Sequence, residues 1–251
     1  MKKIRIFLII IFSLIFTNTL LLAESGFEAI IDMPVGASIT LPIGKPNLRV
    51  SYDSSANIEE LSGKLNASAG ASVKLGYLFD IYDDIGISAL AEIGYQYNSY
   101  TSIVKIKDIG SFKIQDTLTK NIRIHSLKLG LLPKFNKGNF SLGLGFGVKI
   151  PLYAIIASEI VSIDAYVQQY HKNQDIEKLN FNNIKDMYKI PVIPYIKLTA
   201  DYSIFFVDNI AFNVGVYLNY DFGFQVKNSN FREDALEIGF QVGTRFAPML
   251  R

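Results

Sequence analysis

The sequence predicts an all-β protein, an eight-stranded antiparallel up-and-down barrel that crosses a membrane, and three observations support this fold. Apolar residues recur at every second position in segments of about ten residues, the period of a half-buried strand. After residue 25 no stretch approaches 18 consecutive apolar residues, so helical spans do not explain a chain that is 49% hydrophobic. The connections between these segments are alternately long and short, as short periplasmic turns and long extracellular loops require.

Residues 1–25 have the layout of a secretory signal peptide. A cationic start and an almost unbroken apolar run precede small residues at Ala23 and Ser25. Cleavage after Ala23 or after Ser25 leaves residues 26–251 as one outer-membrane β-barrel domain. The alternative is an uncleaved anchor, because the run reaches the lower length limit for a helical span, but polar residues at 17–19 interrupt it.

Eight segments carry the alternation. In the clearest, apolar residues occupy the even positions from Phe140 to Ile150, and Ser, Gly and Lys occupy the odd positions. Each segment has the roughly 9 to 11 residues that a tilted strand needs to cross a bilayer. The predicted strands are 27–41, 69–79, 87–97, 127–135, 140–150, 192–204, 210–222 and 236–246.

A soluble β-sandwich is the main alternative to a membrane barrel. Its outer rows would carry long polar side chains, because they face water. Here the less apolar rows are rich in Gly, Ser and Asn with isolated charges. Small residues are typical of a narrow barrel whose interior has little room, so these rows are expected to face inward.

The connections begin with a long one and then alternate in length. Turn-forming residues fill the short connections, and the second long loop keeps alternating across Asp108–Gly110, which predicts a hairpin that projects beyond the bilayer. The third long loop holds either a short helix or strand extensions that make a ten-stranded barrel. The short connections are 80–85, 136–139 and 206–209; the long ones are 42–66, 98–126 and 151–191, followed by an intermediate loop at 226–233.

Aromatic residues gather near both predicted rims, as in the girdles of membrane barrels. Strand propensity alone explains their number but not their position. At the periplasmic rim we expect Tyr77, Phe79, Phe135, Phe140, Tyr202, Phe205, Phe212 and Phe246, and at the outer rim Tyr97, Tyr100, Tyr153, Tyr220 and Phe222.

Together these segments resemble the small eight-stranded outer-membrane barrels of the OmpA/OmpX type, grouped as an outer-membrane β-barrel domain family. The resemblance covers roughly Gly26 to Phe246 and concerns architecture, not a residue signature. It implies that Phe246 is the C-terminal aromatic residue read by the barrel-insertion machinery. Five residues follow Phe246, which departs from the family pattern.

If the apolar rows face lipid, the opposite rows bring equal numbers of acids and bases into the lumen. Balanced charge in a narrow interior favours a network of ion pairs that plugs the barrel, whereas an ion-conducting path would show an excess of one sign. The expected network comprises Glu28, Asp32, Lys74, Glu92, Lys128, Lys134, Lys149, Lys197, Asp201, Asp221, Glu237 and Arg245.

Catalytic, metal and cofactor sites are not expected. The chain has no Cys and two His. His125 and Ser126 are adjacent and point to opposite faces of a strand unless a bulge re-aims His125, and His171 lies in a polar loop. Nucleic acid is disfavoured as a partner, because removal of the signal segment takes away the basic excess.

The sequence therefore predicts a surface protein of a bacterial outer membrane with a structural or adhesin-like role, exercised through its extracellular loops. Its expected partners are membrane lipid, the insertion machinery and an extracellular protein or host ligand; the oligomeric state stays open. Two alternatives are a narrow passage for small or apolar solutes and a lipid-modifying enzyme that uses His125.

Overall fold

The structure is a computed structural model that describes residues 25–44, 57–82, 84–109, 112–164, 169–227 and 230–250. Apart from Ser25, the predicted signal segment lies outside these residues. The described part contains ten strands and one short helix, and no helix in it is long and apolar enough to cross a bilayer. The elements are β1 (Gly26–Ile43), β2 (Asn57–Gly63), β3 (Leu65–Tyr82), β4 (Ile85–Ile109), β5 (Phe112–Lys137), β6 (Phe140–Asp164), β7 (Gln169–Asn180), α2 (Phe181–Met187), β8 (Ile193–Val207), β9 (Ile210–Gln225) and β10 (Arg232–Phe246).

Eight of the strands close into an antiparallel barrel. Around the ring the order is β1, β3, β4, β5, β6, β8, β9 and β10, and β10 pairs again with β1. Every strand predicted from the alternation belongs to this ring, so the eight-stranded fold is confirmed. The ten-stranded barrel is wrong, because among the described residues β2 pairs only with β4 and β7 only with β6, so both stand outside the ring.

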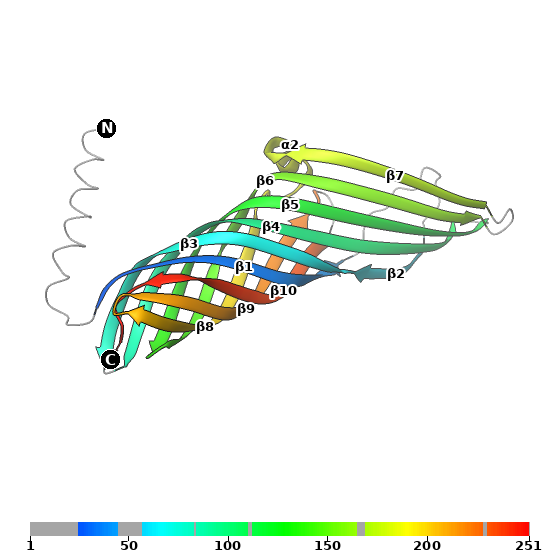
Figure 1. Cartoon of the computed structure of the whole chain (residues 1–251). Coiled ribbons are helices and arrows are strands. Elements are labelled where there is room, and N and C mark those ends of the chain that lie inside the picture. The colour runs from blue at the N-terminus through cyan, green and yellow to red at the C-terminus, as the bar shows by residue number, and fades with distance from the viewer. Residues whose placement is uncertain are drawn as a thin grey trace, which may run out of the picture.

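The short turns lie together at one end of the barrel, here called the short-turn end. They join β3 to β4, β5 to β6 and β8 to β9, and the start of β1 pairs with the end of β10 at the same end (Figure 1). Gly138 occupies the β5–β6 turn with a φ of 53°, a left-handed conformation that favours glycine. The predicted alternation of short and long connections follows from this arrangement.

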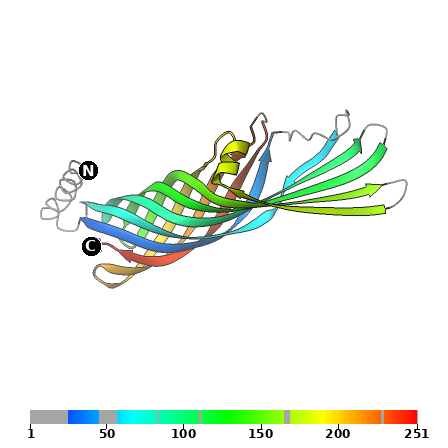
Figure 2. The same ribbon diagram turned by 90° about the horizontal axis from the view of Figure 1, so that it is seen from above.

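At the opposite end, part of the wall continues as a projecting sheet (Figure 2). Strands β4, β5 and β6 run on beyond Asn98, His125 and Tyr153, and β2 and β7 flank them in the order β2-β4-β5-β6-β7. We call this the sheet extension. It contains the predicted hairpin, with β4 ending at Ile109 and β5 beginning at Phe112.

One bulge shifts the alternation where the sheet extension begins. His125 pairs with Tyr153 and Ser126 with Pro151, so Leu152 is the extra residue and the bulge lies on β6. On β5 the even-numbered residues from Ile122 to Asn136 face inward. The expectation that a bulge re-aims His125 is therefore wrong: the inner row of β5 only changes from polar to apolar near Ile124.

Candidate functional site

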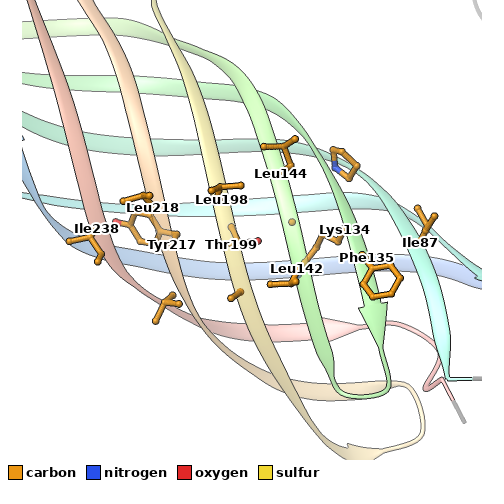
Figure 3. Close-up of a pocket in the computed structure, with 14 residues that line it drawn as sticks. Ile87, Lys134, Phe135, Leu142, Leu144, Leu198, Thr199, Tyr217, Leu218 and Ile238 are labelled. Carbon is orange, nitrogen blue, oxygen red and sulfur yellow. The ribbon is translucent and has the colours of Figure 1, made fainter.

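The outer surface of the barrel is apolar. The even-numbered residues of β6 from Phe140 to Phe146 are 44–51% exposed, and exterior rows on β1 and β10 are similar. Exterior side chains from neighbouring strands, among them Leu142 and Leu198, line an open depression of about 640 Å³ (Figure 3). A continuous apolar surface of this extent requires lipid or detergent around it.

The interior is charged. All twelve residues of the expected lumen network are buried, none more than 4% exposed. Each base lies beside an acid, as buried charges require. The ion pairs are Lys74–Asp32, Lys128–Glu92 at 3.0 Å, Lys134–Asp201 at 2.7 Å, Lys149–Asp221 at 2.7 Å, Lys149–Glu237 and Lys197–Glu92 at 3.9 Å each, and Arg245–Glu28 at 2.8 Å.

Two tyrosines that the sequence analysis did not place inside extend across this network. The Tyr195 hydroxyl donates to Glu92 at 3.0 Å, and the Tyr217 hydroxyl donates to Glu237 at 2.6 Å. The Lys128 ammonium lies 4.7 Å from the Tyr195 ring centroid. The alternation of inward and outward positions could have predicted this, because Tyr217 is an odd-numbered residue of β9, like the inward-facing Asp221.

Glycines on the inner wall make room for these rings. A Cβ on Gly130 would lie 2.1 Å from the Tyr195 hydroxyl oxygen, and one on Gly36 would lie 2.5 Å from that of Tyr217. The small residues of the inner rows thus match the bulky ones opposite, as expected for a filled eight-stranded interior.

A cluster of buried apolar residues lies at the end of the lumen that bears the sheet extension. Helix α2 begins with a capping box between Asn180 and Asn183 and buries Ile184 completely. Ile184 packs in one cluster with Tyr100, Ile122, Ile124, Ala154, Ile156, Leu179, Tyr188, Ile193, Phe224 and Ala235. The predicted short helix in the third long loop is thus confirmed, and it lies over the mouth.

Tyr100 was expected in the outer girdle, and that prediction is wrong. It is 3% exposed inside the barrel and its hydroxyl donates to Asp221 at 2.9 Å. Glu233, absent from the expected network, also lies inside and accepts from Ser102 at 2.6 Å and from Lys120 at 3.4 Å. Burial opposes the charge on Lys120, but Glu233 and Tyr188 together raise the pKa of the Lys120 ammonium above its usual value.

The described residues after Phe246, Ala247 to Leu250, pack against the short-turn end. The Ala247 N–H donates to the Asn209 carbonyl at 3.1 Å, and Leu250 packs with Ala247 and Leu78. Phe246 itself is 39% exposed on the outer row. The residues that depart from the family pattern therefore fold back against the end of the barrel.

The residues considered for catalysis do not meet. His125 lies on the outer surface beside Tyr95, whereas Ser126 is 1% exposed and faces the interior. His171 pairs with Ser162 through the backbone of the sheet extension. Within the described ranges, no group of three or more acidic or histidine side chains is placed to hold a metal ion.

No protein-family model matches the chain, and no curated protein matches its sequence. Several solved outer-membrane proteins are similar in structure. Ail of Yersinia pestis, in complex with the heparin analogue sucrose octasulfate, is 11% identical, with 88% of this chain and 99% of that chain covered and a TM-score of 0.33. The outer membrane protease OmpT of Escherichia coli is 10% identical, with 92% and 99% covered and a TM-score of 0.37.

Two further structures give the same result. Neisserial surface protein A is 10% identical, with 89% of this chain and 98% of that chain covered and a TM-score of 0.29. OprG of Pseudomonas aeruginosa is 9% identical, with 89% and 96% covered and a TM-score of 0.30. The fold rests on the closed ring, the apolar exterior and the buried charges described above. The chain folds as an eight-stranded β-barrel with an apolar exterior and a charged interior. An apolar cluster lies at each end of this barrel, one formed with the C-terminal residues and the other with α2.

Proposed function

We propose that this protein is a surface interaction protein of a bacterial outer membrane, in which a sealed barrel anchors a projecting sheet that binds an extracellular partner. The observation that carries the proposal is the sheet extension. At about 3.3 Å per residue, β6 continues for roughly 35 Å beyond Tyr153, a length that crossing the bilayer does not require.

The extension offers two free strand edges. Among the described residues, β2 pairs only with β4 and β7 only with β6, so one backbone edge of each is open to an added strand. Such an edge binds an extended segment through main-chain hydrogen bonds, with specificity from alternate side chains. Lipid around the barrel and the insertion machinery acting at Phe246 complete the proposed set of partners.

Transport and catalysis are not part of the proposal. The charged network and the apolar layers at both ends argue against a solute path, and the separation of His125 from Ser126 argues against a nucleophile–base pair.

The test compares the full chain with a shortened one, both in liposomes. In the shortened chain, Asn-Gly turns join Thr101 to Asn121 and Ile156 to Glu177, which are cross-strand pairs. We expect the full chain to bind at least one of purified fibronectin, laminin and collagen in surface plasmon resonance, and the shortened chain to lose that binding. Equal binding by both chains, or binding by neither, would contradict the adhesive role.

A further inference from the structure

Four aromatic rings meet on the outer surface where the sheet extension leaves the barrel. His125 stacks on Tyr153 with ring centroids 4.2 Å apart and an interplanar angle of 17°. The Tyr97 and Tyr95 rings lie 5.1 and 5.9 Å from the His125 ring, and the Tyr95 hydroxyl hydrogen-bonds to His125 Nδ1. We call these four residues the aromatic cluster.

The fold holds three of the four residues in one cross-strand row. Tyr97 pairs with His125, and His125 pairs with Tyr153. The bulge at Leu152 turns Tyr153 to the outside, where it is 45% exposed, and Tyr95 is 44% exposed. The cluster therefore presents ring faces and hydroxyl groups to its surroundings.

The cluster lies at the level of the lipid head groups. From Phe140 at the short-turn end to Tyr153, β6 rises roughly 30 Å along the barrel axis, for about 3.3 Å per residue and a tilt of about 40°. An apolar band about 25 Å tall with aromatic girdles at both edges matches this span.

Two cations stand in the next row outward. Arg123 pairs with Ile155, and Ile155 pairs with Lys178, and both cationic side chains are exposed. Arg123 Nε donates to the neutral Asn121 side chain at 3.0 Å. In the described part of the chain, neither cation has a carboxylate partner.

A second aromatic pair at the same end provides the contrast. Tyr220 and Phe222 lie 5.0 Å apart, and Arg232 lies 5.9 Å from the Phe222 ring. There the charge is already balanced, because Arg232 pairs with Asp234 at 2.6 Å. Of these two described clusters, the aromatic cluster is the one whose neighbouring cations have no carboxylate partner.

We propose that the aromatic cluster, Arg123 and Lys178 form a binding site for the phosphorylated head group of an outer-leaflet glycolipid. The sugar lies on the exposed rings, which combine an apolar face with polar hydroxyls. Its phosphate is held by Arg123, whose guanidinium suits bidentate contact, and by Lys178 as a point charge. The inference rests on the proposed outer-membrane location.

Native mass spectrometry of the full chain in mild detergent tests the site, with three lipids as probes. These are bisphosphorylated lipid A, its dephosphorylated form and phosphatidylglycerol. We expect lipid A to bind at least about tenfold more tightly than either of the others. Equal affinity for phosphatidylglycerol, or for dephosphorylated lipid A, would overturn the proposal.

Variants locate the site on the surface. The double variant Arg123→Gln, Lys178→Gln and the single variant Tyr153→Leu should each weaken lipid A binding about tenfold or more. Lys185→Gln, an exposed lysine on α2, is the matched control and should change the affinity less than twofold. Double-variant affinity equal to that of the control would overturn the proposal.

The same preparations are run on gels with and without boiling. A chain that shifts on boiling yet does not prefer lipid A overturns the lipid site alone. A chain that shows no shift overturns the membrane barrel, and the lipid site with it.

Discussion

Glu92 joins three interior side chains, Lys128, Lys197 and Tyr195. Glu92→Gln keeps the side-chain size but leaves two buried ammonium groups without their carboxylate. Removing one partner of a buried ion pair costs about 3–5 kcal/mol. We expect the unfolding free energy, measured by urea titration in lipid vesicles, to fall by about that amount.

The control for this variant is Glu60→Gln in the sheet extension. Lys105 lies 2.5 Å from Glu60 and lowers the pKa of its carboxyl group, through a hydrogen bond and through its charge. Because this pair is exposed, solvent screens it and the unfolding free energy should hardly change. Equal losses in the two variants would show that the lumen network does not stabilise the barrel.

Because Gly130 lies against the Tyr195 hydroxyl, mutations at these two positions should have non-additive effects on the unfolding free energy. Gly130→Ala places a Cβ against the Tyr195 hydroxyl, so we expect a loss of about 1–3 kcal/mol from overpacking. In a Tyr195→Phe background the hydroxyl is gone, and the same change should cost clearly less. A double-mutant cycle of urea midpoints measures the difference, and strict additivity would refute the steric fit.

Single residues show where alternation predicts position and where it does not. The period of two depends only on the strand itself, so it places Glu28 or Lys197 inside without knowledge of any neighbour. The prediction for Tyr100 is wrong because it used only the closeness of an aromatic residue to the rim. Tyr100 lies on the same face of β4 as the buried residues Gln96 and Asn98, and that face points inward. The pairing of acids with bases depends on strand register, which the sequence alone does not contain.

At the scale of elements, the C-terminal tail is predicted to stabilise the barrel. Leu250→Ala removes a 5% exposed side chain that packs on Leu78. We expect a loss of about 2 kcal/mol, at the lower end of the range for buried leucines because the cluster of Leu250 is small. Met249→Ala, at a half-buried neighbour, should cost less, and the same urea titration compares the two; equal losses would mean that the tail does not pack as a plug.

The elements outside the ring were the hardest to predict. The hairpin of β4 and β5 follows from alternation that continues past the bilayer. The position of α2 over the mouth does not, because Ile184 meets Ile122 and Phe224 only after the barrel has closed. The same non-local packing explains why the inner row of β5 turns apolar at Ile124.

For the whole molecule, the sealed lumen predicts an absence of conductance. With apolar layers at both ends and paired charges between them, no continuous water path is expected. In a planar bilayer at high salt the purified chain should give no single-channel steps, with a known porin as the positive control. Reproducible steps would revive the narrow-passage alternative.

The sheet extension also has a mechanical consequence. Strands β4, β5 and β6 run without interruption from the short-turn end to the tip, and their ladder hydrogen bonds lie across the strand direction. A pull on the tip therefore loads many of these bonds in shear at the same time, and does not peel them apart one by one. With the proposed partner bound at the tip, tension would pass along these continuous strands straight into the barrel wall.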